Sequence, residues 1–160
     1  MVSSVDEIRR LAGEVPDPEM PALTIADLGI LRDVRVDASG AVVVDITPTY
    51  SGCPALEVIR EDVDRSIRAH GYRDVTVRVV LSPAWTTDWM TDEGRRKLRE
   101  YGIAPPRVLG GDLQVLELAI TCPICASAHT TEVSHFGSTQ CQAVRTCAGC
   151  GDTFPHFKEH

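Results

Sequence analysis

Two cysteine pairs near the C-terminus place the strongest constraint on how this chain can fold. Cys122 and Cys125 form one Cys-x2-Cys pair, Cys147 and Cys150 form another, and 21 residues separate Cys125 from Cys147. Each pair sets two thiols on one side of a tight turn, so two facing turns offer four sulfur ligands in a tetrahedron. The spacing is typical of a zinc ribbon. Iron, alone or in an iron–sulfur cluster, is the alternative occupant of four thiolates.

The predicted metal site explains how residues 107–160 can fold at all. The strand candidates in this part are 113–120, 130–136 and 139–146. None of them is long enough to build a core, and a module this small needs a metal or disulfides. A four-cysteine site leaves no open coordination position, so we expect the metal to be structural rather than catalytic. Gly149 and Gly151 are expected to take positive φ in the second turn.

Residues 1–106 have the pattern of a small α+β domain, separated from 107–160 by helix- and strand-breaking residues such as Pro105 and Pro106. The predicted strands are 30–37, 41–47 and 74–81, and the predicted helices are 5–12, 92–101 and one that begins at Pro54. An apolar residue recurs at helical spacing from Leu56 to Ile67. We therefore predict a three-stranded sheet with flanking helices, followed by an all-β zinc ribbon.

Composition argues against nucleic-acid and membrane partners. The 160 residues carry a net charge of −7 and only 5% aromatic side chains. The cations of 107–160 are Arg107, Arg145 and Lys158, too few for the basic patch that phosphate neutralisation needs. No apolar run approaches the ~18 residues of a membrane span, and the N-terminus lacks an export signal. We expect the chain to be cytoplasmic and its six cysteines not to form disulfides.

Cys53 is the candidate for thiol chemistry. It lies in the segment Thr-Pro-Thr-Tyr-Ser-Gly-Cys-Pro (47–54), between a predicted strand and a predicted helix. A helix N-terminus favours the thiolate, so we expect a lowered thiol pKa. Thr47, Thr49 and Ser51 could hydrogen-bond the sulfur or a ligand bound to it. The alternative is an inert cysteine packed under the loop.

Other side chains carry weaker signals. Asp17, Glu19 and Asp27 are carboxylates in or near a proline-rich loop, and a solvated acidic loop is the alternative to a cation or partner site. Trp85 and Trp89 share one loop, which is either a packed corner or an exposed docking surface. We expect docking.

The remaining cysteine and the histidines near it have less defined roles. Cys141 has no assigned role, because it can be a buried strand cysteine, an alternative ligand or a redox thiol. His156 and His160 are expected to lie on an exposed tail.

Three segments of the first part resemble the MIP18 (DUF59) family, which is associated with the assembly of iron–sulfur proteins. They are DPEMP (17–21), IADLGI (25–30) and TPTYSGCP (47–54). The tryptophan segment 81–106, FGSTQCQAVRTC (136–147) and the four-cysteine tail resemble one branch of that family, found in aerobic phenylacetate degradation. The resemblance extends over nearly the whole chain, about 15–160.

The resemblance implies an accessory protein rather than an enzyme. Its partners would be the subunits of the multicomponent phenylacetyl-CoA 1,2-epoxidase, with its di-iron oxygenase and iron–sulfur flavin reductase, and the iron–sulfur assembly machinery. Cys53 matches the family's reactive cysteine and would hold iron or a nascent cluster transiently. Asp17, Glu19 and Asp27 match its acidic positions. A second thiol would come from the client or from a homodimer.

Two other functions stay open at this point. One is a structural subunit of the oxygenase complex that handles no metal. The other is a thiol redox protein that uses Cys53 with Cys141. No Cys-x-x-Cys motif surrounds Cys53, so the redox function ranks last.

Overall fold

The computed structural model describes residues 4–108 and 119–160, and these form two compact units, Met1–Thr91 and Asp92–His160. The boundary lies earlier than the one drawn from the sequence after residue 106. The reason is that the chain around Ala104 pairs with the last strand of the second unit. The Ala104 N–H donates to the Pro155 carbonyl at 2.9 Å, and the Phe157 N–H donates to the Ala104 carbonyl at 2.9 Å.

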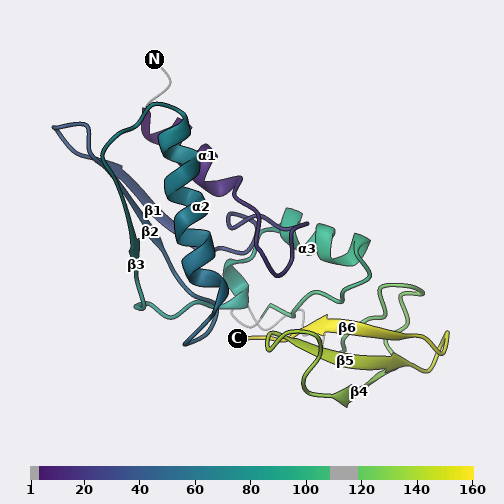
Figure 1. The fold of residues 1–160 in the computed structure, drawn as a ribbon. Helices are drawn as coiled ribbons and strands as arrows, with labels where there is room; N and C mark the ends of the chain where they lie inside the picture. The colour runs from purple at the N-terminus through teal and green to yellow at the C-terminus, as the bar shows by residue number, and fades with distance from the viewer. Residues whose placement is uncertain (1–3, 109–118) are drawn as a thin grey trace. The chain divides into compact units, whose positions relative to one another are not determined.

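The first unit contains a three-stranded sheet with two long helices packed against it (Figure 1). Its elements are α1 (Ser4–Gly13), β1 (Leu31–Val36), β2 (Val42–Ile46), α2 (Ala55–Ala69), β3 (Val75–Val79) and the 3-10 helix η1 (Thr87–Trp89). The strands lie in the order β1-β2-β3, with β1 antiparallel and β3 parallel to the central β2. The parallel pair requires a crossover connection, and α2 supplies it.

The core of the first unit follows from two sequence periodicities. Ile59, Val63 and Ile67 are spaced at helical intervals on α2 and are all buried. Val42 and Ile46, two of the alternating residues of β2, are also buried. Each such side chain contributes about 1.5–3 kcal/mol on leaving water. The predicted helices and strands of this unit are therefore confirmed.

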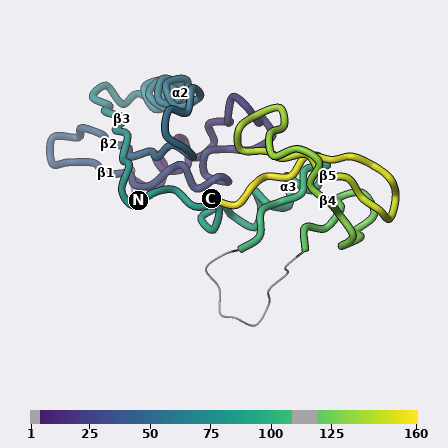
Figure 2. Tube along the Cα trace, turned by 90° about the horizontal axis from the view of Figure 1, so that it is seen from below, coloured from purple at the N-terminus to yellow at the C-terminus, as the bar shows by residue number. Residues whose placement is uncertain are grey.

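The second unit contains α3 (Asp92–Glu100) and an antiparallel sheet in the order β4-β5-β6 (Figures 1 and 2). Its strands are β4 (Thr130–Ser134), β5 (Gln142–Cys147) and β6 (Thr153–Phe157). The sequence did not predict β6, because Pro155 argues against a strand. The expectation of an exposed tail is wrong for His156, which lies in β6 with 3% of its surface exposed. Most of the predicted strand 113–120 lies outside the described residues.

Among the helices of the described ranges, none is long and apolar enough to cross a membrane.

Candidate metal and thiol sites

The four cysteines of the two pairs come together at one end of the second sheet. Their Sγ atoms all lie within 4.8 Å of one another. Cys122 Sγ is 3.8 Å from Cys150 Sγ, and Cys125 Sγ is 3.5 Å from Cys147 Sγ. A tetrahedral ion with metal–sulfur bonds of about 2.3 Å has sulfur–sulfur edges of about 3.8 Å. The described cysteines therefore have the donor type, number and spacing that a tetrahedral metal requires.

Backbone amides support the negative charge that such a site carries. The pKa of Cys147 is lowered to about 6, mainly because the Cys150 N–H donates to its sulfur. The Gly149 N–H also donates to Cys147 Sγ, at 3.3 Å. A thiol must lose its proton to bind a metal, so these amides prepare Cys147 as a ligand.

The two glycines of the second turn act differently from each other. Gly151 has φ +81°, as the sequence predicts. Gly149 does not have a positive φ, so that prediction is wrong. Gly149 is needed because a larger residue would not fit. A Cβ there would lie 3.0 Å from the Ser127 Cβ in the facing turn. The small residue allows the two turns to approach each other.

Cys53 lies just before α2, in the loop that leaves β2. The helix is capped by Pro54, and the Cys53 carbonyl accepts from the Leu56 N–H at 3.2 Å. The thiol is half-buried. Its pKa is raised, because burial outweighs the hydrogen bonds that it receives from the Ala55 N–H and the Thr49 hydroxyl. The lowered pKa expected at a helix N-terminus is therefore wrong for Cys53.

Two of the predicted acidic residues act on this thiol. The charges of Glu19 and Asp17 both raise the Cys53 pKa. Asp17 is buried, and its Oδ1 accepts from the N–H groups of Glu19 at 2.9 Å and Met20 at 2.8 Å. Burial raises the pKa of Asp17 despite these bonds, and burial together with the Asp17 charge raises that of Glu19. The structure thus joins a thiol and two carboxylates in one electrostatic group.

The other residues predicted to support Cys53 have different positions. Asp27 forms a reciprocal cap with Thr24: its Oδ2 accepts from the Thr24 N–H at 3.0 Å, and its N–H donates to Thr24 Oγ1 at 3.1 Å. This is a backbone-stabilising role. Thr47 is buried at the end of β2, where its N–H donates to the Ile30 carbonyl, while Ser51 is exposed at the loop surface.

The tryptophan loop is a packed corner at Trp85. This residue is 6% exposed, and its Nε1 donates to the Leu28 carbonyl at 2.8 Å. The docking prediction is therefore wrong for Trp85. Trp89 is half-buried, with the Arg32 guanidinium 3.6 Å from its ring centroid. Gly29, at φ +73°, lies directly beneath Trp89, and a Cβ there would lie 2.6 Å from the Trp89 carbonyl oxygen.

Cys141 is buried directly before β5, 4% exposed. Its Sγ lies 2.9 Å from Thr139 Oγ1, and its carbonyl accepts from the Lys158 N–H at 2.9 Å. It lies outside the four-cysteine group. These contacts agree with the buried-cysteine interpretation and assign it no chemical role.

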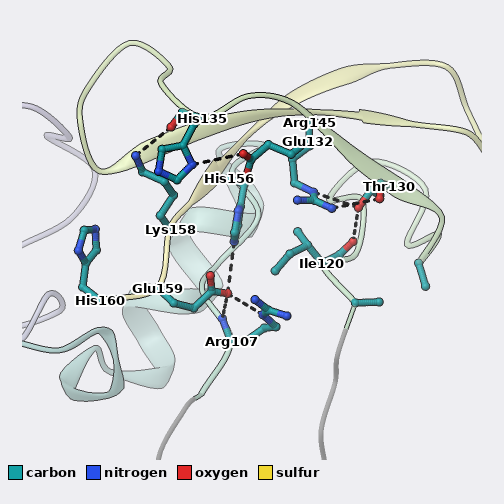
Figure 3. Close-up of a pocket in the computed structure, with 12 residues that line it drawn as sticks. Arg107, Ile120, Thr130, Glu132, His135, Arg145, His156, Lys158, Glu159 and His160 are labelled. Atoms are coloured by element: carbon teal, nitrogen blue, oxygen red, sulfur yellow. Dashed lines mark hydrogen bonds and ion pairs between the residues drawn. The ribbon is translucent and has the colours of Figure 1, made fainter.

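One group of residues was missed by the sequence reasoning. Arg107, Arg145 and Lys158, counted there only as too few for a basic patch, all line one pocket of the second unit (Figure 3). The register of the sheet places Glu132 opposite Arg145 and His156 opposite Ala143, so these side chains share one face. The alternation of polar residues at 156 and 158 was the available signal.

Comparison with known proteins explains the two sites together. Residues 6–79 match a family model described as an iron–sulfur cluster assembly protein, and residues 111–158 match one described as the PaaD zinc beta ribbon domain. A relative from Escherichia coli (strain K12) is 47% identical over 155 residues, covering 96% of this chain and 92% of its own. The chain belongs to the PaaD family. That E. coli member is named, provisionally, as one of the subunits of 1,2-phenylacetyl-CoA epoxidase.

This PaaD-family chain also has relatives that match a little over half of its length. A protein of Porphyromonas gingivalis named as an Fe-S protein maturation auxiliary factor is 35% identical, covering 58% of this chain and 89% of its own length. A solved DUF59 domain from Bacillus anthracis aligns with a TM-score of 0.54 at 27% identity, covering 59% of this chain and 90% of its own. The resemblance to the MIP18 (DUF59) family is thereby confirmed.

Proposed function

We propose that the protein is an accessory factor that assists the assembly or maintenance of iron–sulfur or di-iron centres in the multicomponent 1,2-phenylacetyl-CoA epoxidase, with Cys53 as the transfer thiol. The observation that carries the proposal is the pairing of a cluster-assembly match over 6–79, which encloses Cys53, with near full-length similarity to a protein named as an epoxidase subunit. The chain would act in the cytoplasm and would not itself turn over substrate.

The electrostatics around Cys53 suit a thiol that receives a metal cation. Burial contributes most to the raised pKa of Cys53, and Glu19 and Asp17 raise it further because a thiolate would add a third negative charge. The same field attracts a cation. Iron arriving as cargo would displace the thiol proton to solvent, and a thiolate of the client would later replace Cys53, which then regains a proton. This ligand exchange requires no electron transfer.

One thiolate is too few to retain a cluster. A second sulfur would come from the client or from the same cysteine of a second copy of the chain. The partners we propose are accordingly the oxygenase and reductase subunits and the iron–sulfur assembly machinery.

The four-cysteine site has a different proposed role. We infer that it holds Zn(II) permanently, because a closed set of four thiolates leaves no coordination position for a substrate. Elemental analysis of the purified protein should find one zinc per chain, and Cys147→Ser should abolish it. Iron at this site in place of zinc would contradict the assignment.

Co-expression with the client reductase tests the transfer role. Cys53→Ala should reduce the iron and acid-labile sulfide bound per reductase to the level found without the accessory protein. Cys141→Ala is the matched control, because it removes a thiol from the second unit and should leave client occupancy unchanged. Normal client occupancy and epoxidase activity with Cys53→Ala would contradict the transfer role. A loss with both variants, together with a Cys53–Cys141 disulfide on mild oxidation, would instead favour the redox function.

A structural role in the complex is the second candidate, favoured by the name of the E. coli relative as an epoxidase component. It predicts stoichiometric co-purification with the oxygenase and full activity of Cys53→Ala. Size-exclusion chromatography with mass measurement of the reconstituted complex distinguishes a stable component from a transient factor.

A further inference from the structure

The second unit contains a pocket that neither the proposed thiol transfer nor the four-cysteine site uses. It has a volume of about 460 Å³. Arg145 and Lys158 approach it from β5 and from the residue after β6, and the ring of His156 lies between them and Glu159 (Figure 3). Ligand pockets span about 300–1,000 Å³, so the space suits a small group.

Two cations of this pocket have no acidic partner among the described residues. Lys158 is only 8% exposed, yet its Nζ contacts the His135 carbonyl at 2.9 Å and the Phe136 ring at 4.6 Å, neither of which is charged. The Arg145 guanidinium donates to Thr130 alone, through Nε to Oγ1 at 3.1 Å and through Nη2 to the carbonyl at 3.0 Å. Lys158 is buried and Arg145 is half-buried, and buried charges are normally paired, so the described residues leave a demand for negative charge in this pocket.

His156 adds buried ring nitrogens that lack hydrogen-bond partners among the described residues. It is 3% exposed, and neither ring nitrogen has a hydrogen-bond partner in the described part of the chain. Its Nε2 lies 3.6 Å from Glu159 Oε1, an ion-pair contact when the ring is protonated, so Nδ1 is the nitrogen with no acidic or hydrogen-bond partner among the described residues. Buried polar groups in proteins nearly always have partners, and exceptions call for an explanation such as a ligand.

The carboxylates of the pocket are already engaged. Glu159 Oε1 accepts from Arg107 Nε at 2.8 Å and from the Arg107 N–H at 2.9 Å. Glu132 Oε1 lies 3.3 Å from His135 Nδ1. Glu159 is therefore paired with Arg107, and the contact recorded for Glu132 is to His135 rather than to Lys158 or Arg145. Among the described lining residues, three cations, Arg107, Arg145 and Lys158, face two carboxylates, which disfavours a cation or an apolar molecule as the occupant.

We infer that this pocket binds an oxyanion, a phosphate or a carboxylate group, through Lys158, Arg145 and His156. The ammonium and the guanidinium supply the charge, and the imidazole N–H supplies a donor at the floor. Phosphate and carboxylate groups would make the same contacts, so a binding measurement must decide which of the two the pocket prefers. The inference does not depend on the role of Cys53.

Titration of the full chain followed by NMR tests the pocket. Inorganic phosphate and acetate are added separately at constant ionic strength, with chloride as the reference. At least one should shift the signals of Lys158, Arg145 and His156 saturably, and the stronger of the two identifies the source. Lys158→Met should weaken that binding at least tenfold. Arg99→Gln, which removes a charge from the exposed surface of α3, is the matched control and should leave it unchanged.

Thermal unfolding gives a second measurement. Replacing the unpaired ammonium of Lys158 by an apolar isostere should raise the unfolding temperature without anion and remove the stabilisation that phosphate or acetate gives the unmodified chain. Should Lys158→Met fail to fold, Arg145→Gln must show the tenfold loss instead. The inference is overturned if neither anion gives a saturable shift, or if these variants bind as tightly as the Arg99→Gln control.

Discussion

Gly29 offers the sharpest test of the packing that positions the tryptophan loop, through the substitution Gly29→Ala. A Cβ at this position would lie 2.6 Å from the Trp89 carbonyl oxygen, 2.8 Å from its Cβ and 2.9 Å from its carbonyl carbon. None of these atoms belongs to a flexible side-chain end. The backbone of one of the two segments must therefore move to admit the methyl group.

The magnitude follows from two separate terms. Holding an L-residue at φ +73° costs about 1–2 kcal/mol. Inserting a methyl group into a packed site costs about 1–3 kcal/mol more. Gly40 is the matched control, because it has φ +86° but nothing within 4 Å of its added Cβ. The lower entropy of the unfolded alanine chain is common to both variants and cancels. Gly29→Ala should therefore lose about 1–3 kcal/mol more than Gly40→Ala.

Urea unfolding followed by tryptophan fluorescence measures this difference directly. Both tryptophans of the chain, Trp85 and Trp89, belong to the first unit, so the signal reports that unit alone. The free energy of unfolding comes from linear extrapolation for each variant. Equal losses for Gly29→Ala and Gly40→Ala would show that the close approach to Trp89 has no energetic weight, and the reasoning would be refuted.

Three further predictions concern charge and metal. Glu19→Gln should lower the Cys53 pKa and speed its alkylation at pH 8, measured by peptide mass mapping, whereas the exposed Glu61→Gln should not. A strong chelator should unfold the second unit, seen as lost NMR dispersion there, and leave the tryptophan-reported transition in place. Asp45→Asn should lose about 1–3 kcal/mol at pH 7. Hydrogen bonding to Arg78 lowers the Asp45 pKa, so this stability is present above its ordinary value of 3.8 and lost as pH falls through the lowered one. The loss of stability caused by Asp45→Asn, measured by urea unfolding, should therefore be smaller at pH 3 than at pH 7.

How far the sequence predicts the structure depends on whether the signal is local. The cysteine spacing predicts the gathering of four sulfurs, because each pair lies within one turn. The stripe from Ile59 to Ile67 predicts the buried face of α2, because helical periodicity is also local. The strand β6 is not predicted, since proline is unusual within a strand and Pro155 lies in the middle of it, paired with Val144 of β5.

The candidate sites show the same division. A position next to a helix N-terminus predicts a lowered Cys53 pKa, but the burial and the charges of Asp17 and Glu19 come from a loop more than 30 residues away and reverse the sign. Likewise Lys158 and Arg145 converge only through the sheet register. The first outcome depends on residues distant in the sequence, and the second depends on how β5 and β6 pair.

The raised pKa of Cys53 has a consequence for its survival in an aerobic cell. Peroxide attacks the thiolate, so a thiol held in its protonated form is oxidised slowly. Burial, together with the charges of Glu19 and Asp17, thus keeps the sulfur in its less oxidisable, protonated form. In the proposed transfer role a cation would take the place of this proton, so the thiol would become a strong ligand only when a metal is present.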